Sequence, residues 1–194
     1  MKIIYVRHGE TPDNVERRVQ GQTSRGLTER GKEQAKGTAL KLRTEKIDHI
    51  YSSDLRRAVE TAEIIAGYHP GVPVTYTKDL RERYYGDWQG KTAAQVHWVE
   101  RQKEVYSLGY RPGGDGETIE EIAARLKRVI SNAFEKHRND TVVFVSHGGV
   151  GRIFKALMMG RELEYAQQIP HIAHESMDAY EVDDSFLQRM RTGD

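Results

Sequence analysis

The sequence lacks cysteine and any long apolar run, and each absence excludes a class of protein. Without cysteine, the 194-residue chain has neither disulfide bonds nor a thiol nucleophile. No window approaches the roughly 20 apolar residues that a membrane-spanning helix needs. The start at Met1 also lacks an apolar stretch of signal-peptide length. We therefore expect a cytoplasmic protein.

The chain also has almost no net charge. Its 30 Lys and Arg residues against 29 Asp and Glu give a formal charge of +1. A global electrostatic field that would recruit nucleic acid or a membrane surface is thereby excluded. Any affinity for an anion must come from a local group of basic side chains. With 37% hydrophobic residues and no linker, the length favours a single domain over residues 1–194.

Two stretches share one pattern, an apolar run that ends in a histidine followed by glycine. The run Ile3 to Val6 ends in Arg7-His8-Gly9, and Thr141 to Val145 ends in Ser146-His147-Gly148-Gly149. Each run is typical of a buried strand that leads into a turn. In parallel sheets the carboxyl ends of strands form the ligand-binding edge. If the two strands lie side by side, His8 and His147 face each other across one pocket.

A single histidine at a strand end is usually a half-buried polar residue without a function. Two strand-His-Gly endings in one chain favour a site instead. Glycine after each histidine removes the side chain that would keep an anion away from the backbone.

The first motif, Arg7-His8-Gly9-Glu10-Thr11 with Asn14, resembles the signature of the histidine phosphatase superfamily, in its phosphoglycerate mutase-like branch. Four further stretches agree in order and spacing, and the match spans Met1 to about Arg161. They are Gln20-Gly21 with Leu27 to Gly31, Ser52 to Ala58 with Thr61-Ala62, Leu80-Arg81-Glu82 with Gly86 to Gly90, and Ser146 to Gly149. Each short motif is weak alone, and five in the right order are specific.

The resemblance implies an α/β fold, a three-layer sandwich in which helices flank a mostly parallel central sheet. It further implies a phosphohistidine intermediate and neither a metal nor an organic cofactor. The residues that it assigns to catalysis are Arg7, His8, Arg57, Glu82 and His147. Those that it assigns to substrate binding are Arg7, Asn14, Gln20, Gly21, Arg57, His147 and Gly148.

The hydrophobic pattern predicts alternating strands and helices. Adjacent helical residues lie about 100° apart, so at most one of Arg56 and Arg57 can point into the pocket, and the resemblance selects Arg57. The arginines of the polar loop over residues 15–26 are interpreted as solvated surface charge. Beyond the first and fourth strands, the expected elements are a helix over 28–44, a strand over 47–52, a helix over 56–65, a strand over 72–77, a helix over 119–134, a helix over 149–160 and a strand over 177–182.

Two regions are less regular. Residues 88–118 form a cap-like insertion, within which Ala93 to Tyr110 is expected to begin as a helix. In the tail, residues 171–176 replace the Asn and Ser that the family usually shows. We expect the remaining histidines to be surface or loop residues: His49, His69, His97, His137, His171 and His174.

These residue types suit phosphoryl transfer, which needs positioning and positive charge around three equatorial oxygens. Arg7 and Arg57 offer planar, permanently charged forks that match a phosphate. Their charge also lowers the pKa of His8 and favours its neutral, nucleophilic form. A backbone carbonyl at the Gly9 turn would fix the tautomer. By resemblance, Glu82 would protonate the leaving oxygen and then activate water.

A zinc hydrolase also uses two histidines and a carboxylate. Arginine directly before one histidine, with a second arginine converging from the next helix, would repel a divalent cation, so we expect no metal.

The resemblance leaves several functions open. We favour a phosphomonoester hydrolase acting on a small phosphorylated metabolite, because the region after Gly90 is short and lacks the paired arginines of the mutases. Residues Gly86 to Thr92 resemble the α-ribazole and broad-specificity phosphatases. Alternatives are a phosphoglycerate mutase-type isomerase, a phosphoprotein phosphatase and a binding module that keeps the fold. Neither nucleic acid nor a membrane is expected as a partner, and homodimer formation is left open.

Overall fold

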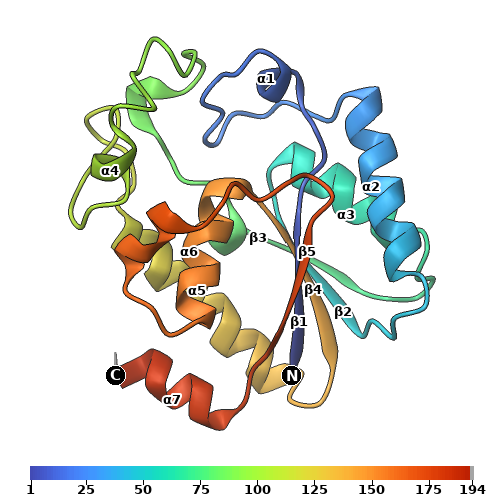
Figure 1. Cartoon of the computed structure of the whole chain (residues 1–194). Coiled ribbons are helices and arrows are strands. Elements are labelled where there is room, and N and C mark those ends of the chain that lie inside the picture. Colours follow the sequence, from blue (N-terminus) through green and yellow to red (C-terminus); the bar gives the residue numbers. More distant parts are fainter. Residues whose placement is uncertain (193–194) are drawn as a thin grey trace.

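A computed structural model describes residues 1–192 and shows a five-stranded sheet with the strand order β3-β2-β4-β1-β5 (Figure 1). Strands β1, β2, β3 and β4 are parallel, and β5 runs antiparallel at the edge beside β1. The mostly parallel sheet predicted from the sequence is confirmed. The strand bounds are β1 Lys2–Arg7, β2 His49–Ser53, β3 Val74–Thr77, β4 Thr141–Ser146 and β5 Met177–Glu181.

Helices cover both faces of the sheet (Figure 1). Helices α2 (Glu29–Leu42) and α3 (Arg56–Ala66) pack on one face over Ile4, Ile50 and Val143. The other face is covered by α5 (Ile119–Lys136) and α6 (Gly148–Met158), whose apolar residues join a larger core with Tyr5 and Phe144. The remaining helices are α1 (Pro12–Val15), α4 (Gln102–Val105) and α7 (Asp184–Thr192), with short 3-10 turns at Lys78–Leu80, Gly86–Trp88 and Leu163–Gln168.

Two of the long helices start at threonine caps. The Thr28 side chain accepts a hydrogen bond from the Gly31 N–H at 2.9 Å, as the sequence predicts for α2. At the start of α5, Thr118 and Glu121 form a reciprocal capping box. These caps satisfy backbone donors that would otherwise be unpaired at each helix start.

The pairing of β1 with β4 brings the two strand-His-Gly endings together. Their register places Arg7 opposite Ser146, and the His8 N–H continues the ladder by donating to the Ser146 carbonyl at 3.0 Å. Both strands therefore end at the same edge of the sheet, as predicted. Loops from several parts of the chain gather at this edge (Figure 1).

Some local expectations are wrong. Residues 91–101 form consecutive turns, and the helix expected at the start of the 93–110 segment is the short α4 at Gln102–Val105. His49, expected at the surface or in a loop, lies half-buried in β2, with its ring 4.4 Å from that of Tyr51. Over residues 1–192, no helix is long and apolar enough to cross a membrane.

Candidate active site

His8 sits at the floor of the site in a defined tautomer. Its side chain is buried, and Nδ1 lies 2.7 Å from the carbonyl oxygen of Gly9. A carbonyl can only accept, so Nδ1 carries the proton. The other nitrogen, Nε2, accepts a hydrogen bond from Arg57 Nε at 3.3 Å and is therefore unprotonated. The Gly9 carbonyl fixes the tautomer as expected, and it leaves a lone pair on Nε2.

The surroundings keep His8 neutral. Burial lowers its pKa well below the usual value, and the positive charges of Arg57 and Arg7 lower it further. At neutral pH the imidazole is therefore an uncharged nucleophile.

Arg57, the second residue of α3, is buried, whereas its neighbour Arg56 is exposed and pairs with Glu60 at 2.7 Å. The Arg57 guanidinium donates to the carbonyls of Thr23 at 2.9 Å and Gly21 at 2.6 Å. These bonds fix the fork beside His8. Burial lowers the pKa of Arg57 to about 10, which leaves it charged at neutral pH.

Arg7, the last residue of β1, lies on the other side of His8 and is 5% exposed. Its Nη1 donates to the carbonyl of Ile172 and to His171 Nε2, the latter at 3.0 Å. Its Nε is buried without a hydrogen-bond partner. Burial lowers the pKa of Arg7 to about 10, again without loss of its charge at neutral pH.

His147 stands behind His8, fully buried, with ring centroids 5.1 Å apart. Its Nε2 lies 2.8 Å from the Ser53 hydroxyl, while Nδ1 is buried without a partner. Burial, followed by the charge of Arg57, lowers its pKa well below the usual value. His147 is therefore neutral in the ligand-free protein at neutral pH.

The Glu82 carboxylate occupies the amino end of α6. Its Oε2 accepts from the Gly149 N–H at 3.0 Å, and Oε1 accepts from the N–H groups of Val150 at 3.1 Å and Arg83 at 2.8 Å. The partial positive charge of this helix start therefore acts on the carboxylate that lines the cavity.

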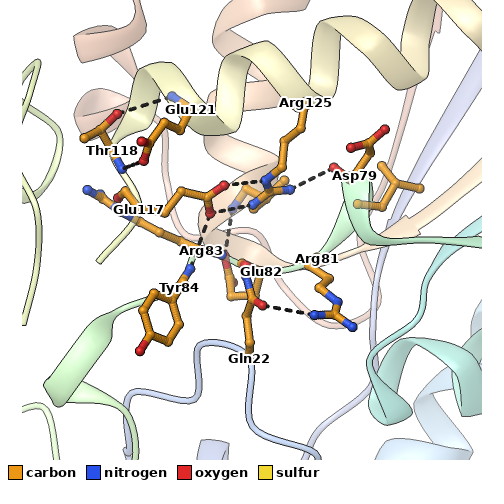
Figure 2. Close-up of polar contacts among 12 residues, drawn as sticks. Gln22, Asp79, Arg81, Glu82, Arg83, Tyr84, Glu117, Thr118, Glu121 and Arg125 are labelled. Carbon is orange, nitrogen blue, oxygen red and sulfur yellow. Dashed lines mark hydrogen bonds and ion pairs between the residues drawn. The ribbon is translucent and has the colours of Figure 1, made fainter. Parts of the chain in front are cut away.

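A polar network surrounds Glu82 (Figure 2). Arg81 forms a fork-like ion pair with Asp54, with two N···O distances of 2.6 Å. Arg83 is buried and donates to the backbone carbonyls of Glu117, Val105 and Tyr110, at 2.6 Å, 2.5 Å and 2.9 Å. The chain on both sides of Glu82 is thus fixed, on one side to the loop between β2 and α3 and on the other to the cap-like insertion.

Eight of the nine site residues predicted from the sequence line one cavity of about 350 Å³, and the ninth, His147, lies behind it. Further lining residues come from the 88–118 segment, from α6 and from two loops. Together the wall comprises Arg7, His8, Asn14, Arg17, Arg18, Val19, Gln20, Gly21, Arg57, Glu82, Tyr85, Ala93, Trp98, Gln102, Tyr106, Gly148, Gly149, Arg152 and His171.

The sequence reading missed several of these residues. Arg17 and Arg18, interpreted as solvated charge, line the cavity, whereas Arg25 pairs with Asp13 at 3.3 Å outside it. His171 and His174 do lie in a loop, but His171 contacts Arg7, and His174 Nδ1 donates to the His8 carbonyl at 2.8 Å. The sequence could have placed Arg152 at the site, because it follows Gly148 by four residues and therefore lies on the same face of the predicted helix.

Within residues 1–192, no three His, Cys, Asp or Glu side chains are arranged to hold a metal ion. The chemistry available to this site comes from two buried guanidiniums, a neutral histidine with an unprotonated Nε2 and a carboxylate.

The family model of the histidine phosphatase superfamily (branch 1) matches residues 3–191. The chain therefore belongs to that superfamily.

Two relatives from Arabidopsis thaliana show the range of named activities. One is "Phosphoglycerate mutase-like protein 4", 39% identical over 157 residues, which are 78% of this chain and 68% of the relative. The other is a "Metal-independent phosphoserine phosphatase", 35% identical over 187 residues, which are 88% of this chain and 76% of the relative.

Solved structures give the same fold. A mycobacterial glucosyl-3-phosphoglycerate phosphatase in complex with VO3 superposes with a TM-score of 0.87 at 29% identity, over 96% of this chain and 93% of that one. The α-ribazole phosphatase from Shigella flexneri gives a TM-score of 0.84 at 25% identity, over 96% and 93%. The resemblance to phosphatases of this type is confirmed, and phosphatase-named relatives support a phosphatase enzyme.

Proposed function

We propose that the protein hydrolyses phosphate monoesters of small metabolites through a phosphohistidine on His8. The single observation that carries this proposal is the state of His8: Nδ1–H donates to the Gly9 carbonyl, and the unprotonated Nε2 accepts a hydrogen bond from Arg57 Nε at 3.3 Å, close to the charges of Arg57 and Arg7. A neutral imidazole with a fixed lone pair is a nucleophile, and adjacent positive charge stabilises an equatorial phosphoryl group.

In the first step, His8 Nε2 attacks phosphorus, the ester P–O bond breaks, and Glu82 in its protonated form gives its proton to the leaving oxygen. In the second step, water attacks the phosphohistidine, Glu82 takes the proton from the water, and the N–P bond breaks to release phosphate. Splitting the reaction in this way is covalent catalysis with one carboxyl group acting as acid and then as base.

Two buried nitrogens without hydrogen-bond partners support the binding of an anion beside His8. Arg7 Nε, in the residue before His8, and His147 Nδ1, whose ring centroid lies 5.1 Å from that of His8, are buried without hydrogen-bond partners. An unpaired buried donor costs about 1–3 kcal/mol. Phosphoryl oxygens between them would provide acceptors, which agrees with the VO3 complex of the mycobacterial relative, since vanadate mimics phosphate.

The cap supports a small substrate rather than a phosphoprotein. Ala93, Trp98, Gln102 and Tyr106 wall the cavity on the side away from the sheet, and its volume is about 350 Å³. This is at the small end of the range for metabolite pockets.

The test is to trap the covalent intermediate. Mixing the protein with a ³²P-labelled phosphomonoester and quenching in alkali should leave label that is stable to base, labile to acid and located on His8. The variant His8→Ala should lose both the label and turnover of para-nitrophenyl phosphate. The control His49→Ala removes a histidine outside the cavity and should keep both. Turnover by His8→Ala at the wild-type rate would overturn the nucleophile assignment.

A mutase activity remains the second candidate, because the relative with 39% identity carries that name. The protein is incubated with 3-phosphoglycerate, with and without 2,3-bisphosphoglycerate. Release of inorganic phosphate in both reactions supports a hydrolase. Formation of 2-phosphoglycerate that depends on the bisphosphate would instead establish an isomerase.

A further inference from the structure

The Ser53 hydroxyl is buried beside the site and takes no part in the two reaction steps described above. The strand order β2-β4-β1 sets three strand ends in a row, with Ser53 at the end of β2, His147 directly after β4 and His8 directly after β1. Ser53 Oγ lies 2.8 Å from His147 Nε2. His147 thus stands between Ser53 and the nucleophile in this row.

The partners of the Ser53 hydroxyl fix the direction of this hydrogen bond. Among residues 1–192, Ser53 Oγ contacts His147 Nε2 and, at 3.3 Å, the Leu55 N–H. A backbone N–H can only donate, so the Leu55 amide occupies a lone pair of the hydroxyl oxygen. The hydroxyl hydrogen is then left with one acceptor, which is His147 Nε2. Ser53 therefore donates to His147, and the proton of the neutral ring lies on Nδ1.

The other protonation states of His147 leave more groups unpaired. If Nε2 carried the proton, it would donate to Ser53, and the hydroxyl hydrogen would have no acceptor in a residue that is 0% exposed. The lone pair of Nδ1 would be unused as well, because Nδ1 is buried without a partner. A doubly protonated ring would leave the same hydroxyl hydrogen unpaired. Buried donors without acceptors are unfavourable, so both alternatives are disfavoured.

The electrostatic surroundings of His147 agree with a neutral ring. Burial lowers its pKa well below the usual value, and the charge of Arg57 lowers it further. A neutral ring has one N–H group, and the contact with Ser53 decides which nitrogen carries it.

We propose that Ser53 is a positioning residue that keeps the proton of His147 on Nδ1. This proposal rests on the proposed function, in which Nδ1–H donates to a phosphoryl oxygen beside His8, whose ring centroid lies 5.1 Å from that of His147. His147 then acts as a neutral donor, and its hydrogen bond to the phosphoryl group does not require an imidazolium. Ser53 itself touches neither the substrate nor the phosphorus, and it acts only through the tautomer of His147.

Ser52 provides a matched control on the same strand. It is equally buried, and its hydroxyl donates to the Ser53 carbonyl at 2.9 Å instead of to a histidine. Ser52→Ala therefore removes a neighbouring buried hydroxyl and leaves the tautomer of His147 unchanged. Any effect of losing a buried hydroxyl as such appears in this variant.

The first experiment reads the tautomer directly. Long-range ¹H–¹⁵N NMR spectra of the ligand-free protein distinguish protonated from unprotonated ring nitrogens, and the His147→Asn variant assigns the His147 signals by their loss. Wild type and Ser52→Ala should both show the proton on Nδ1. In Ser53→Ala, part or all of the proton should move to Nε2. A wild-type spectrum with the proton on Nε2, or a Ser53→Ala spectrum equal to that of wild type, would overturn the proposal.

The second experiment tests whether Ser53 acts through His147. With para-nitrophenyl phosphate, Ser53→Ala should lower kcat/KM about tenfold, the size of one hydrogen bond. Ser53→Thr keeps the hydroxyl and should recover most of the loss, and Ser52→Ala should stay within about twofold of wild type. The His147→Asn variant has no tautomer to fix, so adding Ser53→Ala to it should cause no further loss.

An equal loss from Ser53→Ala with and without His147→Asn would show that Ser53 acts on the fold alone, and would reject a positioning role. Failure of the proposed function gives a different result, since wild type would then not hydrolyse para-nitrophenyl phosphate. The NMR spectra need no turnover and would still decide which nitrogen of His147 carries the proton and whether Ser53 keeps it there.

Discussion

The half of the cavity around His8, called here the phosphoryl half, and the half walled by the 88–118 segment, called here the leaving-group half, are built in different ways. The phosphoryl half uses the last residues of β1 and β4 and the first residues of α3 and α6, so its backbone is fixed by the sheet and by helix starts. The leaving-group half uses turns over residues 91–101, the short α4 and the loop over 169–176. In such a design the leaving-group half can change its residues without disturbing the core.

Glu82 and Arg83 mark the boundary between the two halves. The Glu82 carboxylate belongs to the rigid half, through the amides of Gly149 and Val150. The next side chain, Arg83, belongs to the cap half, through three backbone carbonyls. Glu82 thus takes part in the chemistry, and the adjacent Arg83 attaches the cap. Substitutions at these two positions should therefore affect the two halves of the cavity separately.

The largest expected effect is the loss of catalytic rate in the Glu82→Gln variant. With glycerol 3-phosphate, kcat should fall about 10²- to 10⁴-fold, because the alkoxide leaves without a proton donor. With para-nitrophenyl phosphate the leaving group needs no proton. A rapid-mixing measurement should therefore show one fast turnover per site, followed by slow hydrolysis of the phosphoenzyme.

The exposed Glu104→Gln on α4 is the control and should behave as wild type. Equal slowing of the first turnover on both substrates would contradict the acid role of Glu82.

The next effect is on stability. Arg83→Met leaves three carbonyls of the cap half without a donor, and unfolding by urea should require about 2–4 kcal/mol less free energy. Limited proteolysis should cut the variant first within residues 88–118. Arg128→Met, which breaks an exposed ion pair with Asp79, should change stability by less than about 1 kcal/mol. An Arg83→Met variant as stable as wild type would show that the cap half does not depend on this side chain.

The buried histidines of the phosphoryl half predict a dependence of stability on pH. Burial lowers the pKa of His8 and His147 in the folded protein, so below about pH 6.5 the unfolded chain binds protons that the folded chain does not. The free energy of unfolding should therefore fall as the pH drops below this value, by up to about 1.4 kcal/mol per pH unit for each histidine.

Urea titrations at pH 7.5, 6.5 and 5.5 measure this slope. His8→Asn should lose less stability on acidification than wild type. Parallel pH profiles for the two proteins would contradict a neutral, buried His8.

The smallest effect concerns α2, which contributes no side chain to the cavity wall. Thr28→Ala removes the cap bond to the Gly31 N–H and should cost about 1 kcal/mol of stability. Thr28→Ser keeps a hydroxyl acceptor and should restore most of it. Thermal unfolding of the three proteins checks the order, and a Thr28→Ala variant as stable as wild type would contradict the cap.

The phosphoryl half could be predicted from the sequence, and the leaving-group half could not. Short apolar runs, Gly-containing turns and threonine caps act locally, so the strands ending at Arg7 and Ser146 and the start of α2 came out as expected. Arg17, Arg152 and His171 line one cavity only because two loops and α6, which are far apart in sequence, pack together. Turns over 91–101 are held by local hydrogen bonds together with a distant one from the Ala93 N–H to the Arg17 carbonyl, and their apolar residues are spaced as in a helix.

Two glycines, Gly9 and Gly31, allow the backbone of the loop after His8 to pack directly against the backbone of the first turn of α2. A Cβ on Gly9 would lie 2.2 Å from the Gly31 carbonyl oxygen, and a Cβ on Gly31 would lie 2.1 Å from the carbonyl oxygen of Glu10. Backbone rests directly on backbone there, with no flexible side chain to absorb a shift. A methyl group added at position 31 would push the loop after His8 and so displace the imidazole, although α2 contributes no side chain to the cavity wall. Screens for inactive variants should therefore recover substitutions at position 31 together with substitutions of cavity residues.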